Sequence, residues 1–421
     1  MKFRTINFFV LTTLLVVITF SSCSKEDSLE KIEPNLSELV KISVTSLPDK
    51  TTYSLGEPLS LKGLIVEGIN SDNSKQRLDI TEANISGFSS EKSSDNLTLS
   101  VTINKLTTTF SVKVLPIKVE NGVLTKVEAN LTRLVLPDFV TSIASNVFRQ
   151  SKITHVTLNE GLKSIGEQAF AWSQITEINF PKTLVTIDEA AFYGCDYLKE
   201  IDLSQTSLTQ ITHETFALNK NVTVIKLPQS VKEIEYQAFL NATSLKELYL
   251  PDGLLKMGNE AFRESGLVNL RLPNSLCYMD QRVFYLSGEL ERVETFGRAV
   301  VNTSIADQKL EASTFERCPK LIHFEIPQNV EIIGQNTISG SPNLESIVIP
   351  ATVKQINFNA FANTGLKVVT VEGTAPAIAN TISGAWQAFP YTVQTIKVPA
   401  GSVETYKAAH GWNSFAKQIV E

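Results

Sequence analysis

The chain has 421 residues, 43% of them hydrophobic, which is enough for two or three domains that each bury a core of their own. Its formal net charge is -6. Without residues 1–22, which hold Lys2 and Arg4 but no acid, 36 basic residues face 44 acidic ones, a balance of -8. Nucleic acid is therefore not an expected partner, because phosphate binding needs a basic surface.

The N-terminus is typical of a signal peptide over residues 1–22. Two basic residues precede an apolar stretch at 8–20, which is shorter than the roughly 20 residues that span a membrane. Phe20-Ser21-Ser22-Cys23 resembles the lipobox of bacterial lipoproteins, with Phe20 where leucine is usual. The resemblance implies that Cys23 is acylated and becomes the new N-terminus. The alternative is that cleavage falls elsewhere and Cys23 is an ordinary residue.

Residues 23–38 follow as the lipidated cysteine and an acidic tether without apolar periodicity. Ser24-Lys25-Glu26-Asp27 within it is similar to the signal that sends lipoproteins of Bacteroidota to the outer face of the outer membrane. An acidic linker without such a signal is the alternative.

Residues 39–116 predict a small all-β sandwich. Alternating apolar segments at 41–45, 61–66, 97–101 and 109–114 are separated by turn signals. The stretch from Lys50 to Glu57, with Leu61 and Gly63-Leu64 after it, resembles bacterial Ig-like domains of surface proteins. The resemblance implies a spacer, with a binding module as the alternative.

Residues 118–421 repeat one unit at a nearly fixed period. Leu227 to Ile234 with its Ala238-Phe239 matches Ile349 to Ile356 with its Ala360-Phe361. Each unit also carries a strand written Leu-x-x-Ile-x-Leu that buries one face, so neighbouring units must stack into one core. The anchors of the eleven units are Phe148, Phe170, Phe192, Phe216, Phe239, Phe262, Phe284, Phe315, Ile338, Phe361 and Phe389.

This pattern resembles the BspA-type leucine-rich repeats of surface lipoproteins of Bacteroidota. The resemblance implies a leucine-rich-repeat solenoid of parallel strands with short helical or 3-10 turns, closed by a C-terminal cap at about 399–421. The expected fold class is thus multidomain, an all-β Ig-like sandwich followed by that solenoid.

One candidate binding surface is the outward side of the repeat strands. Tyr249, Arg271 and Arg292 are of residue types enriched at binding hot spots and fall on consecutive strands, with Glu247 beside them. A merely solvated sheet face is the alternative. The predicted strip, one residue per strand, is Thr157, Asn179, Asp202, Lys226, Tyr249, Arg271, Thr295, Glu325, Val348, Thr370 and Lys397.

The other candidate is a pair of insertions at about 297–309 and 374–387, the second of which contains Trp386. Both lengthen the segment from strand to anchor, so we expect them on one flank of the solenoid, where insertions often form a binding face. Tolerated loop variation is the alternative.

We expect no catalytic residue, metal or cofactor, because no nucleophile, phosphate-loop or zinc motif occurs and the four histidines are scattered. Cys195 and Cys318 each follow an anchor by three residues and lie five repeats apart, about 24 Å at about 4.8 Å per strand. A disulfide needs Cα atoms within about 7 Å, so these thiols and Cys277 should be reduced.

The sequence therefore predicts a monomeric, lipid-anchored protein of the outer membrane that faces the cell exterior and touches the membrane only through its anchor. Its expected partner is a macromolecule, a protein of a host or neighbouring cell before a glycan, as for an adhesin. Capture of glycans or nutrients and a structural role in the envelope are the alternatives.

Overall fold

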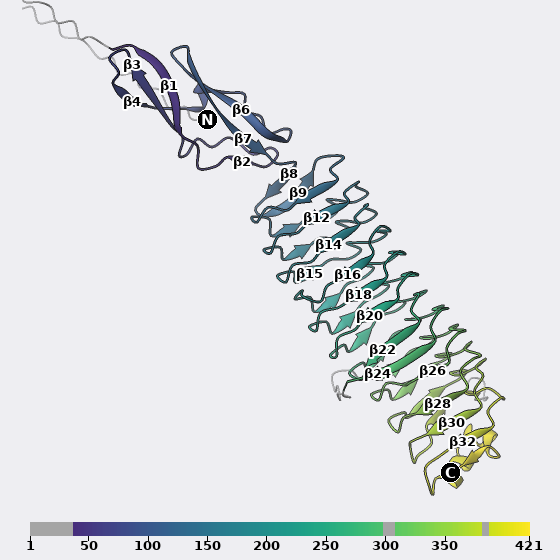
Figure 1. Ribbon diagram of the computed structural model, residues 1–421. Helices are drawn as coiled ribbons and strands as arrows, with labels where there is room; N and C mark the ends of the chain where they lie inside the picture. Colours follow the sequence, from purple (N-terminus) through teal and green to yellow (C-terminus); the bar gives the residue numbers. More distant parts are fainter. Residues whose placement is uncertain (1–36, 298–307, 381–386) are drawn as a thin grey trace, which may run out of the picture.

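The computed structural model describes residues 37–297, 308–380 and 387–421. Cys23 and Trp386 lie outside the described residues, as does most of the first predicted insertion. A small sandwich leads into a long solenoid, and the last residues close the far end (Figure 1). This confirms the expected fold class.

The sandwich packs two sheets on a core that includes Tyr53, Val66 and Leu99, all fully buried. One sheet has the order β1 (Leu39–Ser46), β3 (Ile65–Asn70), β4 (Lys75–Leu78), and the other β2 (Thr52–Tyr53), β7 (Leu106–Val114), β6 (Ser94–Ile103), β5 (Ile85–Ser86). A short 3-10 helix, η1 (Glu82–Asn84), precedes β5.

One strand boundary of the sandwich was predicted wrongly. The strand expected at 61–66 begins only at Ile65 and continues to Asn70. The preceding residues form a turn, in which the Leu64 amide donates to the Leu61 carbonyl at 3.0 Å and Gly63 has a φ of 88°. Alternation at period two cannot distinguish such a turn from a strand end.

The solenoid begins with an antiparallel hairpin, β8 (Ile117–Glu120) and β9 (Val123–Val127), and then winds through two series of parallel strands. We call them the front and back strands. The front strands are β10 (Arg133–Val135), β12 (His155–Thr157), β14 (Glu177–Asn179), β16 (Glu200–Asp202), β18 (Val224–Lys226), β20 (Glu247–Tyr249), β22 (Asn269–Pro273), β24 (Arg292–Phe296), β26 (His323–Phe324), β28 (Ser346–Ile349), β30 (Val368–Val371) and β32 (Thr395–Lys397).

The back strands are shorter and continue from β9. They are β11 (Ser142–Ile143), β13 (Ser164–Ile165), β15 (Thr186–Ile187), β17 (Gln210–Ile211), β19 (Glu233–Ile234), β21 (Lys256–Met257), β23 (Tyr278–Met279), β25 (Lys309–Leu310), β27 (Ile332–Ile333), β29 (Gln355–Asn357) and β31 (Ile378–Asn380).

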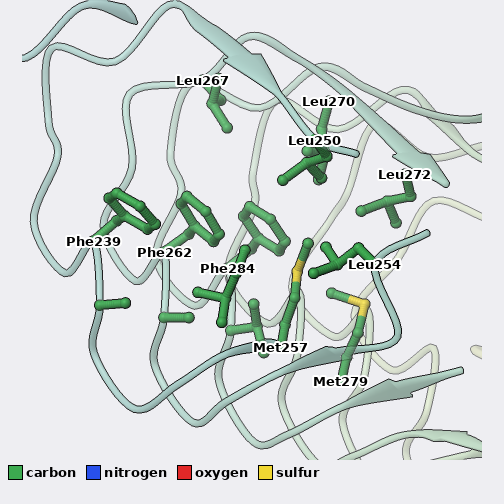
Figure 2. Close-up of a cluster of buried hydrophobic side chains, with 14 of the residues drawn as sticks. Phe239, Leu250, Leu254, Met257, Phe262, Leu267, Leu270, Leu272, Met279 and Phe284 are labelled. Carbon is green, nitrogen blue, oxygen red and sulfur yellow. The ribbon is translucent and has the colours of Figure 1, made fainter. Parts of the chain in front are cut away.

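The predicted anchors form the spine of the core. All eleven are at most 1% exposed, and the rings from Phe148 to Phe315 stack with centroids 4.7–5.6 Å apart. Figure 2 shows three of these rings, Phe239, Phe262 and Phe284, beside the leucines and methionines that fill the same core. Each ring therefore covers the next, and no unit buries its own apolar face alone.

The anchors sit in turns rather than helices. In the described solenoid residues, helix occurs only in the C-terminal segment, and the residue two before and two after most anchors has a positive φ, as Gln237 (51°) and Asn241 (63°) around Phe239. These paired left-handed residues reverse the chain around the buried ring, where short helical turns were expected.

The C-terminal segment covers the last repeat with α1 (Val403–Ala408), η2 (Trp412–Phe415) and β33 (Ile419–Val420), which pairs with β32. Trp412 is fully buried, lies 5.7 Å from the Phe389 ring and donates from Nε1 to the Ala377 carbonyl at 2.9 Å. The Tyr406 hydroxyl donates to the carbonyls of Gly373 and Ala375 at 2.7 and 3.0 Å. The open end of the core is thus sealed by aromatic rings.

The two insertions do not lie in the same part of their repeats, which corrects the expectation of a single flank. The first lies between front strand β24, which ends at Phe296, and back strand β25. The second begins after back strand β31, because Ile378–Asn380 pairs with β29 instead of forming loop. The count of residues from front strand to anchor did not reveal β31, because this strand has only three residues.

The sandwich is joined to the solenoid by direct hydrogen bonds. The Leu55 amide donates to the carbonyl of Ile117, the first strand residue of the solenoid and fully buried, at 2.7 Å. Ser93 donates from its amide and its hydroxyl to the Glu128 carboxylate, both at 2.7 Å. These bonds limit independent rotation of the two domains.

Candidate functional site

The outward strip predicted along the front strands exists with one change. In register, Asp202 lies beside Lys226 and Lys226 beside Tyr249. Arg271, however, pairs with Glu294, whereas Thr295 pairs with Leu272. The strip therefore contains Glu294 in place of Thr295, because β24 is offset by one residue from the position that the repeat pattern suggested.

Of the predicted hot-spot residues, Tyr249 and Arg271 are exposed and Arg292 is half-buried, and each contacts a neighbour on its own or an adjacent strand. Tyr249 is 53% exposed and its hydroxyl donates to Glu247 at 2.7 Å. Arg292 donates twice to Glu294 at 3.1 Å, and the Arg271 guanidinium lies 5.1 Å from the Phe296 ring centroid. Strands β20 and β22 belong to different sheets, so Tyr249 and Arg271 are not joined by a ladder.

The front strands are not one continuous sheet. They divide into four sheets, with breaks between β14 and β16, β20 and β22, and β26 and β28. The back series also breaks between β15 and β17. Both series are therefore interrupted between the same two repeats, those anchored by Phe192 and Phe216.

An extra residue accounts for part of this irregularity. From Leu203 to Leu208 the chain takes five steps, whereas the same loop takes four from Leu227 to Val231. The core still packs across this break, because the Phe180 ring meets the Phe216 ring edge-on at 6.4 Å and the Phe192 ring stacks on Phe216 at 5.3 Å.

A cleft of about 850 Å³ opens at the break between β14 and β16. We call it the front cleft. Its lining combines four acids and two lysines with the largely buried residues Ile178 and Phe180. The charged residues are Glu160, Glu177, Glu200, Asp202, Lys182 and Lys199.

Some charges of the front cleft are already paired. Lys226 lies 2.7 Å from Glu200 and 3.1 Å from Asp202, which holds these two acids on one side. Burial raises the pKa of Asp202, but hydrogen bonds from Ser204 and Lys226 outweigh it, so this pKa lies below its usual value. Asp202 is therefore a carboxylate at neutral pH.

Other charges of the front cleft have no ion-pair partner among the described residues. They are Glu160, Glu177, Lys182 and Lys199. A cavity with a partly apolar lining and unpaired charges of both signs offers apolar contact area to a polar macromolecule, and its charges can orient that partner.

A second, smaller cleft of about 360 Å³ marks the break between β26 and β28. Glu325 lies in its wall and accepts hydrogen bonds from the Thr295 amide at 2.7 Å and hydroxyl at 3.0 Å. Burial raises the pKa of Glu325, but these two hydrogen bonds lower the pKa by more. The pKa therefore lies below its usual value, and the group is ionised at neutral pH. No feature of the repeat pattern had indicated either cleft.

The three described cysteines are free and buried, which agrees with the expected reduced thiols. No group of three metal-binding side chains occurs within residues 37–297, 308–380 and 387–421. Over the same residues, the structure contains no helix with the length and apolar character of a membrane span.

Both domains match known protein families. Residues 119–239, 209–305 and 298–382 match the BspA type leucine rich repeat region in six copies, and residues 46–114 match the bacterial Ig-like domain (group 3). An Ig-like domain followed by a leucine-rich-repeat solenoid is thus the class that the fold defines. The repeat matches span 264 of the 421 residues (119 to 382), and the chain belongs to the BspA-type leucine-rich repeat family.

Solved structures with similarity to the chain include a leucine-rich repeat protein from Bacteroides ovatus, with 19% identity, a TM-score of 0.46, and coverage of 76% of this chain and 90% of that one. A leucine rich cell surface protein from Faecalibacterium prausnitzii has 18% identity and a TM-score of 0.41, over 74% and 97% of the two chains. The pneumococcal vaccine antigen PcpA has 15% and 0.37, over 76% and 85%. The curated proteins contain no match.

Proposed function

We propose that this protein is a lipid-anchored cell-surface protein that binds a macromolecule, a protein before a glycan, through the front face of its solenoid. The observation that carries this proposal is the front cleft, which combines open volume with unpaired charges of both signs. In this proposal the protein acts as a non-enzymatic monomer on the outer face of the outer membrane.

Exposed side chains extend the front cleft along the solenoid. Beyond Lys226, the row continues through Tyr249 and Arg271 to Glu325 beside the second cleft. Tyrosine and arginine at such positions are typical of binding hot spots. An extended partner such as a protein strand or loop can contact several repeats at once, which a compact ligand cannot.

The Ig-like domain fits the role of a spacer in this proposal. Its hydrogen bonds to the solenoid through Leu55 and Ser93 make the two domains a stiff unit. Acylation of Cys23 would then leave residues 24–38 as the leash, with the front face held away from the membrane.

Binding to immobilised extracellular-matrix proteins, with a glycan array in parallel, tests the proposal. The variant Glu177→Arg/Lys199→Glu reverses two unpaired charges of the front cleft and keeps the net charge, so its binding to the protein ligand should weaken at least about tenfold. Asp252→Arg/Lys152→Glu makes an equivalent pair of charge reversals at exposed positions outside the cleft and serves as the control.

Saturable binding that is lost only in the cleft variant supports the proposal. Equal binding by both variants would move the site away from the front cleft. Binding to glycans alone would favour the capture of glycans or nutrients, and silence of both panels would favour a structural role in the envelope.

A further inference from the structure

One of the anchor turns that follow the back strands carries an exposed tryptophan at a position with a positive φ. Trp172 follows anchor Phe170 by two residues and has a φ of 59°. This turn position has a positive φ in other repeats too, and Trp172 is the one aromatic residue with a positive φ among the described residues. The residues at the equivalent place are Gln150, Gly194, Leu218, Asn241, Glu264, Leu286, Arg317, Gly340 and Asn363. Tryptophan has no local advantage there, because a positive φ strains side chains with a bulky Cβ substituent.

The indole of Trp172 is also poorly buried for its size. It is 45% exposed, although tryptophan contributes most to stability when it is covered. Its six-membered ring rests on Gly194 so closely that a Cβ there would collide with it, and Tyr193 meets it edge-on at 5.2 Å. One side of the indole is therefore fixed against the protein while much of the ring remains in contact with solvent.

A small hollow of about 110 Å³ adjoins this ring. We call it the Trp172 hollow. Its polar lining consists of the Arg149, Gln168, Tyr193 and Glu214 side chains. None of these four makes a side-chain hydrogen bond or ion pair within the described part of the chain, so their donors and acceptors are free.

We propose that the Trp172 hollow binds a glycan, with one sugar ring stacked on the indole and its hydroxyls bound by Arg149, Gln168 and Glu214. A pyranose has an apolar C–H face that suits an exposed aromatic ring. Its adjacent hydroxyls, each both donor and acceptor, suit guanidinium, amide and carboxylate groups. This is a second site. It lies on the anchor turns and not on the front strands, and it does not depend on the proposed front-face function.

Other ligands that stack on aromatic rings fit less well. An ammonium ligand would need a cage of several rings, and Arg149 would offset its attraction to Glu214. A nucleobase would bring its phosphates to a chain with a net charge of -6. A neutral or weakly acidic sugar meets neither obstacle.

The hollow has a continuation along the solenoid. The Glu214 amide donates to the Tyr236 carbonyl in the next repeat, and the Tyr236 ring is 41% exposed and lies 6.2 Å from the His213 ring. Trp172 and Tyr236 are three repeats apart, about 14 Å at about 4.8 Å per strand. An oligosaccharide along the solenoid axis could therefore reach a second ring.

The test is a glycan array read with the full mature chain and with the variant Trp172→Asn. Asparagine tolerates a positive φ, so this variant should unfold at the same temperature as the parent or higher, while its glycan binding should fall about tenfold or more. Trp172→Phe keeps a ring and should retain part of the binding. Tyr391→Asn removes an aromatic ring that is 85% exposed, away from the hollow, and should change nothing.

Three further variants distinguish loss of glycan binding from loss of folding. Gln168→Ala and Glu214→Ala remove polar groups without removing a ring and should each weaken the same glycan. Tyr236→Ala should weaken only the longer glycans. Binding of a matrix protein through the front cleft should be unchanged in Trp172→Asn, which separates this proposal from the front-face function.

Silence of the array with the parent chain would overturn the proposal. So would glycan binding that is equal in Trp172→Asn and the parent chain, or that is unaffected by Gln168→Ala and Glu214→Ala. Loss of glycan binding in these three variants, with normal binding by Tyr391→Asn, would establish the site.

Discussion

Phe284 and Phe315 stack with their ring centroids 5.1 Å apart although 31 residues separate them in the sequence. Phe262 and Phe284, only 22 residues apart, stack at 5.3 Å. The nine additional residues therefore leave the spacing of the core unchanged. An insertion of this kind is compatible with the solenoid because neighbouring repeats stay in contact through their anchors.

Removal of residues 298–307, with Gly297 joined to Gln308, should leave the solenoid folded. The free energy of unfolding should change by less than about 1 kcal/mol, because a change in loop length costs little. Circular dichroism during urea denaturation measures it. A large loss of stability would show that the segment is structural.

Truncation of one anchor should have a much greater effect. Phe262 is fully buried between two stacked rings, so Phe262→Ala should cost about 3–5 kcal/mol and lower the urea midpoint. Tyr249→Ala, at a position 53% exposed, should stay within about 0.5 kcal/mol of the parent. Equal effects of the two substitutions would contradict the stacked-ring account of stability.

The buried thiols should make the protein less stable in alkali. Burial raises the pKa of Cys195 and of Cys318 to about 12. In the unfolded chain a thiol has a pKa of about 8.5. Stability from these groups is therefore complete below about pH 8.5 and is lost progressively as the pH rises towards 12, because the unfolded state releases the protons first.

The double variant Cys195→Ala/Cys318→Ala tests this dependence. Alanine already occupies the equivalent position at Ala242, so the variant should fold. Between pH 7.5 and 9.5 its unfolding temperature should fall less than that of the parent chain. Identical slopes would mean that the thiols do not contribute. At pH 8 the native thiols should also resist alkylation until denaturant is added.

The lipid anchor gives a separate prediction. Cys23→Ala removes the sulfur that would carry the thioether, so the protein should move from the detergent phase to the aqueous phase in Triton X-114 partition. Retention of this variant in the detergent phase would rule out anchoring through Cys23.

Much of the fold could be predicted because it depends on periodic burial. The anchor pattern identified Phe148 to Phe389 as one core, and each of these residues is buried. The local register of the strands was harder to predict from the sequence. The repeat pattern placed Thr295 in the strip instead of Glu294, because a one-residue offset of β24 leaves the spacing of the anchors unaffected.

The sites were the least predictable part. The front cleft lies where β14 and β16 do not pair, and the second cleft lies where only the isolated bridge Glu325–Val348 joins the chain at β26 to β28. Such breaks depend on loop lengths within a single repeat, such as the extra residue between Leu203 and Leu208. Trp172 occupies a turn position that many residue types fill in other repeats, so its exposure is what distinguishes it. Tyr249 and Arg292 were predicted as exposed residues of the front strands, and whether they bind a partner stays a prediction.

The most direct test of front-face recognition is amide hydrogen exchange of the chain with and without the protein ligand that the binding panel identifies. Exchange should slow in residues 176–182 and 199–205, which line the front cleft, and stay unchanged in the turns around Trp172. Protection confined to the Ig-like domain or to the back strands would contradict the account.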